Sequence, residues 1–263
     1  AHGGGGFSEA GRPHTGLQRI TFSVSSTAGA SDTTITRSVL KRFNGSLPEP
    51  EPDPPPGGRR CVLNATTSVA STWVNEFAGQ QGTNYSTGPY SQEMNILYLA
   101  GSRRFSYLRF DIAANKVCDN GVTLPAGAVF RGAEVRLYTF NIGGGPACGA
   151  DSCWHVMERV SGAWDQSSLT WTNQPCPKGY AVSCQPGGTA STILFQHGTG
   201  ALDWSARYQR VQAPQLISDL QSFYDSPSSN HGWAIKEACA QTYGKACGSI
   251  SPGFQMVSSR AAT

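Results

Sequence analysis

The chain has few charged residues and no long apolar segment. Only 14% of its 263 residues are charged, and the formal net charge is +3. A charge this mild argues against an electrostatic surface for nucleic acid. No apolar run approaches the ~18 residues that a membrane-spanning helix requires. The composition therefore predicts neither a nucleic-acid partner nor a membrane span.

The sequence also lacks the local motifs of the common enzyme classes. It contains no Gly-x-Ser-x-Gly, no His-Glu-x-x-His and no phosphate-binding glycine loop before a helix. Asp165 and Glu158 are the two carboxylates that resemble the catalytic pair of a glycosidase. Asp111, Asp119 and Asp203 offer oxygen ligands for calcium, but without the spacing of an EF-hand. We therefore predict a protein that is not an enzyme, with no catalytic residue, no metal site and no cofactor.

Cysteine is plentiful, and its even number indicates disulfides. Eight cysteines in a chain rich in glycine favour an oxidising compartment over a metal site, because no Cys-x-x-Cys occurs. Three pairs close in sequence are each expected to close one loop, which leaves a long-range fourth pair, although eight cysteines allow 105 connectivities. The expected pairs are Cys148–Cys153, Cys176–Cys184, Cys239–Cys247 and Cys61–Cys118.

The chain begins at Ala1 without a hydrophobic leader. We read this as a mature N-terminus left by removal of a signal peptide. Together with the cysteines, it predicts export to the extracellular space or the cell surface.

A proline-rich segment divides the chain into an arm and a body. Residues 1–47 form the arm, in which Ile20, Phe22 and Val24 alternate with polar residues, as in a strand with one buried face. Residues 48–60 form the linker, and such a run favours extended polyproline II, reaching roughly 40 Å. Residues 61–263 form the globular domain.

Short β-prone runs between turns fill this domain. We expect strands near 66–74, 96–100, 105–112, 129–141, 153–160, 201–207, 232–238 and 254–258, besides 20–24 and 33–40 in the arm. One helix is predicted at 214–224, where apolar residues fall on one face after Pro214. Helices and strands do not alternate along the chain. The fold class is therefore predicted as all-β, an antiparallel two-sheet β-sandwich of jelly-roll type.

Several segments resemble, in order, the DNRLRE family of extracellular β-sandwich modules, some of which are carbohydrate-binding modules. The likeness covers roughly 66–260. It is carried by 82–85 (GTNY), 107–111 (YLRFD), 132–138 (GAEVRLY), 164–175 (WDQSSLTWTNQP), the glycine-led strand at Trp233 and 254–260 (FQMVSSR). The resemblance implies a non-enzymatic module of a secreted surface protein, and a structural turn at Trp164–Asp165.

The chain departs from the family pattern at its end. Family modules continue after the Ser-Ser turn with a closing strand of the type Arg-Pro-x-Leu-x-Val, whereas this sequence stops at Thr263. Residues 12–24 are similar in character to that strand. The arm therefore either folds back on its own domain or enters a neighbouring copy head to tail. We favour the second, with Leu17, Ile20, Phe22 and Val24 as the donor strand of a homopolymeric extracellular filament. The groove that receives it is expected between strands around 107–111 and 254–257.

Loop aromatics support an alternative function. Exposed tyrosines in glycine-rich loops can stack on sugars, and the candidates are Tyr85, Tyr90, Tyr180 and Tyr243. Trp73, Trp154, Trp171 and Trp233 are expected in the core instead. The alternative is an adhesive, carbohydrate-binding module with a polysaccharide partner.

Overall fold

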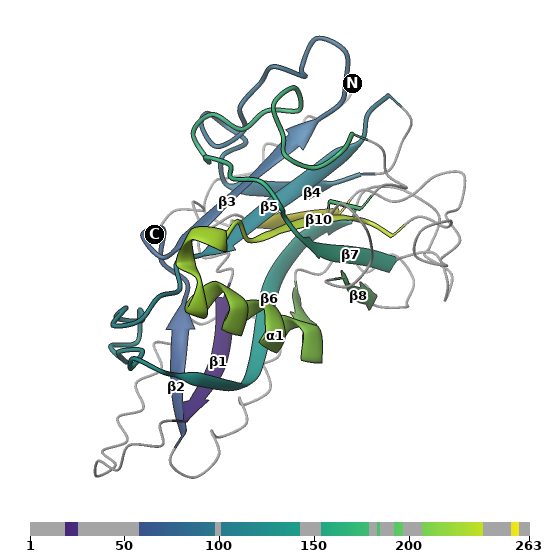
Figure 1. The fold of residues 1–263 in the computed structure, drawn as a ribbon. Coiled ribbons are helices and arrows are strands. Elements are labelled where there is room, and N and C mark those ends of the chain that lie inside the picture. The colour runs from purple at the N-terminus through teal and green to yellow at the C-terminus, as the bar shows by residue number, and fades with distance from the viewer. Residues whose placement is uncertain are drawn as a thin grey trace.

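The computed structural model describes residues 19–25, 58–97, 101–142, 154–178, 183–184, 192–196, 207–238 and 254–257. This part of the chain consists mostly of antiparallel strands and contains one α-helix (Figure 1). The strands are β1 (Arg19–Ser25), β2 (Gly58–Leu63), β3 (Val69–Asn75), β4 (Glu93–Ile96), β5 (Arg104–Phe110), β6 (Val129–Ile142), β7 (Trp154–Arg159), β8 (Thr192–Gln196), β9 (Arg207–Val211), β10 (Trp233–Glu237) and β11 (Phe254–Val257). The helices are α1 (Pro214–Asp225) and the short 3-10 helix η2 (Pro227–Ser229).

The strands form two antiparallel sheets. The first has the order β2-β1-β6-β11-β4, with β9 also paired to β6. The second has the order β3-β5-β10-β7-β8. The expected all-β class is confirmed for the described residues.

One hydrophobic core contains residues from both sheets and from α1. Leu63 of β2, Leu137 of β6, Phe110 of β5, Trp233 of β10 and Phe223 of α1 all belong to it, and all are fully buried. Burying a large apolar side chain contributes about 1.5–3 kcal/mol. This shared core is therefore the main source of stability in the described part of the chain.

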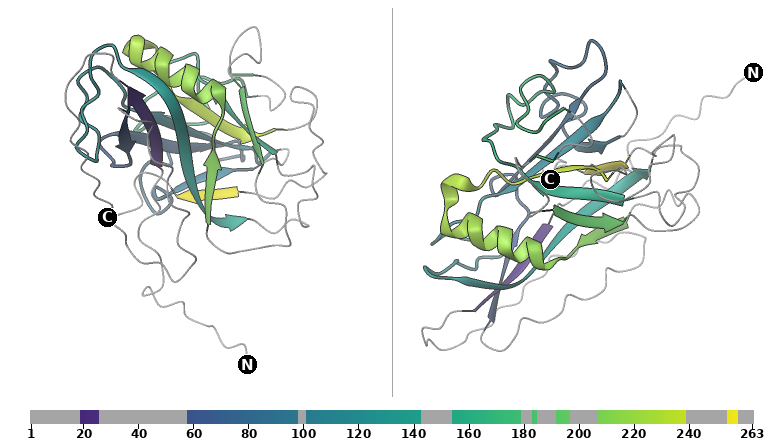
Figure 2. Two further views of the ribbon diagram at one scale, coloured as in Figure 1. Left: turned by 90° about the horizontal axis from the view of Figure 1, so that it is seen from below. Right: turned by 45° about the vertical axis from the view of Figure 1, so that its right-hand side comes forward.

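Helix α1 packs against β6 (Figure 2). Pro214 stands in its first turn, where a missing N–H costs nothing. Its buried face includes Leu216, Leu220 and Tyr224, as the helical spacing predicts. The buried Trp233 indole donates a 2.7 Å hydrogen bond to Asp219 of the same helix. The predicted helix is confirmed.

The segment 160–178 covers the other face of the second sheet. Trp164 and Trp171 join Phe105 and Tyr107 of β5 in a second apolar cluster. The Tyr107 hydroxyl donates to Gln174 Oε1 at 2.9 Å, and burial raises the pKa of this phenol. Trp164 and Trp171 are therefore buried residues of the segment that covers the second sheet.

Most expected strands in the described residues occur within a few residues of their predicted positions, but three strands were not anticipated. β2 begins at Gly58, inside the predicted linker, and β8 and β9 were missed. Residues 33–40 and most of 201–207 lie outside the described residues. Trp73, Trp171 and Trp233 are buried as expected, while Trp154 is half-buried against Val156 and Ala238.

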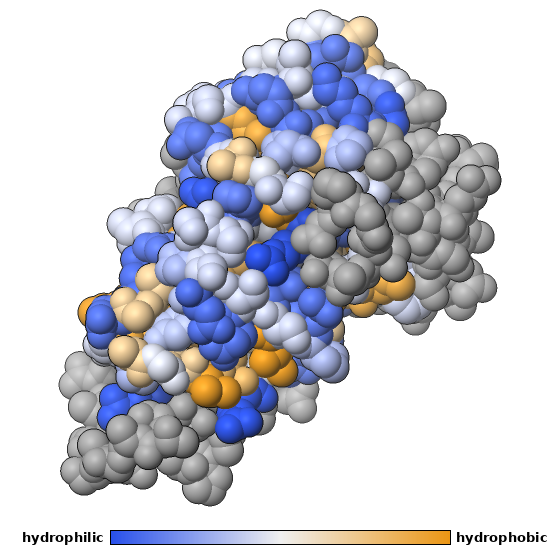
Figure 3. Space-filling view, viewed as in Figure 1, coloured by the Kyte–Doolittle hydropathy of each residue, from blue (hydrophilic) through white to orange (hydrophobic). Residues whose placement is uncertain are grey.

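Hydrophilic residues predominate on the face drawn in Figure 3, where hydrophobic residues appear as small separate patches. Large apolar side chains exposed in the described residues include Phe77, Tyr90, Val117, Val129 and Leu194. The longest helix of the described chain, α1, has 12 residues, and none there is long and apolar enough to cross a membrane.

Candidate strand-insertion site

Strand β1 lies between β2 and β6 in the first sheet (Figure 1). It pairs antiparallel with β2 along one edge and with β6 along the other. It is therefore an interior strand through which β2 joins the rest of the sheet. We call the space between β2 and β6 that β1 occupies the β1 slot.

The register places the apolar positions of β1 opposite core residues. Ile20 pairs with Leu63 and Val135, both fully buried. Phe22 pairs with Cys61, which is also fully buried, and with Ala133 of β6. Directly opposite residues of an antiparallel ladder share one face of the sheet. Ile20 and Phe22 therefore occupy positions on the face of the first sheet that packs against the core.

The other two predicted donor residues are placed differently. Val24 pairs with Phe130 and Arg59, after a register shift between Ser23 and Val24. Leu17 lies outside the described residues. The described strand thus contains three of the four predicted positions.

The connection from β1 to β2 is far longer than its ends require. Ser25, the last residue of β1, pairs with Gly58, the first residue of β2. Neighbouring strands lie about 4.8 Å apart. Residues 26–57 nevertheless supply thirty-two residues, whereas a hairpin needs about 2–5.

Strands β1 and β11 follow one another along the same edge of β6. β9 pairs with β6 from Val135 to Thr139. Within this range, Arg136 of β6 also pairs with β1, and Thr139 of β6 also pairs with β11. Because a strand residue can pair with one neighbouring strand on each edge, β1 and β11 both lie along the edge of β6 that faces away from β9. Both run antiparallel to β6, and β1 begins close to where β11 ends.

The outer edge of β2 is covered by the turn after Cys118. The Val62 N–H donates to Asn120 Oδ1 at 3.2 Å, and the Asp119 N–H donates to the Val62 carbonyl at 2.8 Å. The Asn120 amide also donates to the Arg60 carbonyl at 2.7 Å. The edge of β2 that faces away from β1 is thus already paired.

Asp119 fixes the chain that leaves β2. Its carboxylate accepts the N–H groups of Asn64 and Ala65 and the hydroxyl of Ser68. Sequence reasoning proposed Asp119 only as a calcium candidate. Its place in a Cys-Asp-Asn-Gly turn was the available signal, since Asp and Asn side chains bond nearby backbone in such turns.

Two of the four expected disulfides lie in the described residues, and both are confirmed. Cys61–Cys118 joins β2 to the turn that covers its edge. Cys176–Cys184 lies within the cover over the second sheet. The other four cysteines, Cys148, Cys153, Cys239 and Cys247, lie outside the described residues.

The expectation that Tyr85 is exposed is wrong. Tyr85 is only 5% exposed, because its ring stacks on Trp73 at 3.7 Å. Tyr90 is 53% exposed and meets both rings edge-on. Tyr180 and Tyr243 lie outside the described residues.

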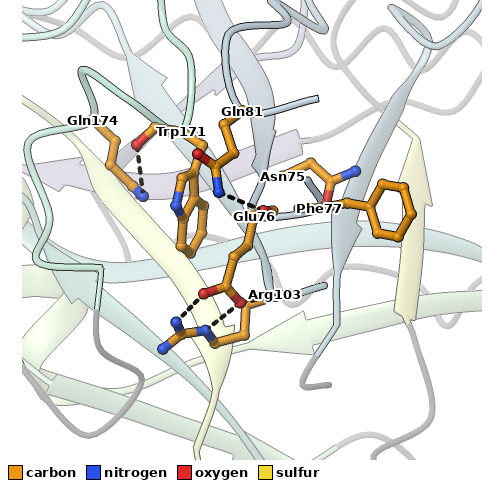
Figure 4. Close-up of polar contacts among 7 residues, drawn as sticks. All are labelled: Asn75, Glu76, Phe77, Gln81, Arg103, Trp171 and Gln174. Carbon is orange, nitrogen blue, oxygen red and sulfur yellow. Dashed lines mark hydrogen bonds and ion pairs between the residues drawn. The ribbon is translucent and has the colours of Figure 1, made fainter. Parts of the chain in front are cut away.

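Polar contacts among Glu76, Gln81 and Arg103 hold the segment that follows β3 (Figure 4). Glu76 and Arg103 form a two-point ion pair, which includes a 2.6 Å bond from Arg103 Nε. The Arg103 guanidinium also lies 5.7 Å from the Trp171 ring centroid. Hydrogen bonding to Arg103 lowers the pKa of Glu76 from its ordinary value, against an opposing effect of burial. Sequence reasoning did not anticipate this pair.

The two carboxylates of the glycosidase comparison have separate structural partners. Asp165 is exposed and accepts the N–H and hydroxyl of Ser167, which lowers the pKa of its carboxyl. Glu158 is buried, 2.6 Å from Lys236 Nζ, and accepts the Cys184 N–H at 3.1 Å. Burial lowers the pKa of Lys236, against the opposing effect of Glu158.

Potential metal ligands do not cluster in the described part of the chain. No group of three or more His, Cys, Asp or Glu side chains there is arranged to hold a metal ion. Asp111 pairs with Lys116, and Asp203 lies outside the described residues.

Comparison with known proteins adds no family. No protein-family model matches the chain, and no curated protein matches it.

Proposed function

We propose that this protein is an exported structural subunit of an extracellular fibre or matrix, in which β1 of one copy fills the β1 slot of the next. The observation that carries the proposal is the pairing of Ser25 with Gly58 across a connection of thirty-two residues. A strand held by so long a connection can make the same pairs in its own subunit or in a neighbouring one.

The connection is long enough to reach a neighbouring subunit. Thirty-two residues extend to roughly 100 Å, while a globule of this length is about 50 Å across. Residues 48–56 include six prolines, and a polyproline II segment of nine residues spans about 28 Å. Such a semi-rigid segment suits a spacer between subunits better than a turn that doubles back.

The proposed contact is heterologous, because one subunit gives a strand and the next receives it. Contacts of this kind propagate head to tail into a filament unless a ring closes. Since β1 makes equivalent pairs in either arrangement, the connection and the local concentration of subunits decide between them. Affinity comes from backbone pairing, and register comes from Ile20 and Phe22 opposite the core.

The remaining features agree with this assignment. The two sheets would face each other across their shared core as a β-sandwich, in keeping with the DNRLRE resemblance. The two described disulfides suit an oxidising compartment outside the cell. In family modules a closing strand follows the penultimate one, and β1 lies next along β6 after β11.

A cysteine pair across the slot tests whether β1 comes from another copy. Ser23 and Gly132 are register partners, and a β-carbon at Gly132 would meet nothing within 4 Å. We would co-produce a Ser23→Cys chain and a Gly132→Cys chain with different tags. Exchange between copies predicts a disulfide-linked species of twice the chain mass that carries both tags and disappears on reduction.

A control pairs Ser23→Cys with Ala133→Cys, at the next residue along β6, which pairs with Phe22 and packs against the core. It should give little crosslinking, because adjacent residues of a strand point to opposite faces. If the Ser23→Cys/Gly132→Cys double variant closes only within single chains and the mixed sample gives no dimer, the arm folds back on its own domain. The fibre proposal then fails.

The second candidate is an adhesive carbohydrate-binding module, which the exposed ring of Tyr90 favours. A half-exposed tyrosine supported by Trp73 and Tyr85 offers an aromatic face to a sugar. Glycan-array binding that Tyr90→Ala removes, in a protein that gives no interchain crosslink, would favour this candidate.

A further inference from the structure

The two edges of β2 differ in what holds them. Its inner edge pairs with β1. Its outer edge uses the Val62 N–H, the Val62 carbonyl and the Arg60 carbonyl, all bonded to Asp119 or Asn120. Because the N–H groups of a strand alternate in direction, those of Cys61 and Leu63 face β1.

Covalent and side-chain contacts anchor this outer edge to the body of the domain. The Cys61–Cys118 disulfide joins the middle of β2 to the start of the covering turn. Cys118 is itself tied to the turn, since its N–H donates to the Val122 carbonyl at 2.7 Å. The Asp119 carboxylate secures the chain beyond Leu63 through Ser68. None of these contacts includes a residue of β1.

We propose that β2 and residues 118–122 form a preformed wall of the β1 slot, which keeps its place when β1 leaves. Its occupant is β1 of a second copy of this chain. The inference rests on the proposed function, because a standing wall matters for assembly only if β1 passes between copies. The receiving subunit then presents a strand edge that is already folded, and β1 can pair with it without prior folding of β2.

The buried side chains and the backbone groups of this wall suit a strand as occupant. Cys61 and Leu63 are fully buried and stand opposite Phe22 and Ile20. The backbone groups of the same two residues supply the pairing edge. An extended segment with alternate apolar residues matches both features, as in other cases of strand addition.

Residue-resolved amide hydrogen exchange of the full chain tests the wall directly. A Phe22→Asp substitution weakens the seating of β1, because it places a charge opposite Cys61. We expect exchange at Cys61 and Leu63 to accelerate about tenfold or more, while exchange at Val62 changes little. Equal acceleration at all three amides would show that β2 leaves with β1, and would overturn the proposal.

A second variant keeps the test decisive if Phe22→Asp unfolds the protein, which loss of protection at the buried Ile235 of β10 would reveal. Asn120→Ala leaves β1 intact and removes the acceptor of the Val62 N–H. Exchange should then accelerate at Val62 and remain slow at Cys61 and Leu63. If Asn120→Ala leaves Val62 as well protected as before, the covering turn does not hold β2 and the wall proposal is wrong.

The two proposals fail in different ways. Absence of interchain crosslinks between Ser23→Cys and Gly132→Cys chains contradicts the fibre, whatever the exchange pattern of β2. Interchain crosslinks together with simultaneous exposure of Cys61, Val62 and Leu63 leave the fibre standing and remove the preformed wall.

Discussion

Gly232 lies against the backbone of Leu108, so close that a β-carbon at this position would be 2.2 Å from the Leu108 carbonyl oxygen. Its φ of +68° is in the left-handed region that favours glycine. The residue directly precedes β10, whose Trp233 pairs with Leu108. The glycine thus allows β10 to enter the sheet beside β5.

Gly232→Ala should destabilise the protein by about 3 kcal/mol or more, because the added methyl meets backbone that cannot move aside. The free energy of unfolding in urea measures the effect. Gly121→Ala is a matched control, since Gly121 also has a positive φ of +81° but open space around its β-carbon. It should cost only about 1 kcal/mol. Equal losses would mean that the close approach to Leu108 is unimportant.

Alternation in β1 predicts opposite outcomes at neighbouring positions. Phe22→Asp places a carboxylate opposite Cys61 and Ala133, and should abolish high-mass species in size-exclusion chromatography with light scattering. Ser23→Asp stands opposite Arg60 and Gly132, and should leave assembly within about threefold of the parent. If both substitutions act alike, the register between β1 and its neighbours is wrong.

Local periodicity predicted β5 and α1 well, because each presents a repeating apolar face over several residues. Strand β2 was missed, since Gly58 and the two arginines after it follow a proline-rich run and carry no β signal of their own. Its pairing depends on β1 and on Asp119 and Asn120, which lie outside this local stretch of sequence. Tyr85 was misplaced for the same reason, because its burial depends on stacking with Trp73.

The sequence also predicted a strand around Ile20, but the neighbours expected for it, near 107–111 and 254–257, are wrong, because β1 pairs with β2 and β6. Alternation specifies which residues share a face, but not which strands lie on either side. The position between β2 and β6 depends on pairing with residues 58–63 and 129–136, which lie far along the chain.

The two described disulfides should differ in their effect on stability. Cys61 and Cys118 are 57 residues apart, whereas Cys176 and Cys184 are 8 apart. Loop-closure entropy predicts losses of about 4 and about 2.5 kcal/mol for Cys61→Ser/Cys118→Ser and Cys176→Ser/Cys184→Ser, respectively. Urea denaturation of the two double variants measures both. The first should also accept β1 from tagged parent chains about tenfold less well, while the second should accept it normally.

Acid should weaken the ion pair between Glu76 and Arg103. The hydrogen bond from Arg103 lowers the pKa of Glu76 below its ordinary value of 4.5. The folded state therefore binds this proton less readily than the unfolded chain, and stability falls as the pH drops below about 4.5. Between pH 7 and pH 3, the parent should lose about 1 kcal/mol more than Glu76→Gln. Parallel pH profiles of the two proteins would contradict this.

The buried pair of Lys236 and Glu158 should show strong coupling between its partners. The side chains are 0% and 1% exposed, so removing either charge leaves the other in an apolar layer. Glu158→Gln and Lys236→Met should each cost about 3–5 kcal/mol. The double variant Lys236→Met/Glu158→Gln removes both charges and keeps an acceptor for the Cys184 N–H. It should therefore be more stable than either single variant.

A double-mutant cycle in urea measures this coupling. If the two single losses simply add in the double variant, Lys236 and Glu158 do not stabilise each other. The pair would then be two separately accommodated charges. A coupling energy of about 2 kcal/mol or more would instead show that the ion pair is what permits a lysine and a glutamate to be buried beneath the Cys176–Cys184 cover.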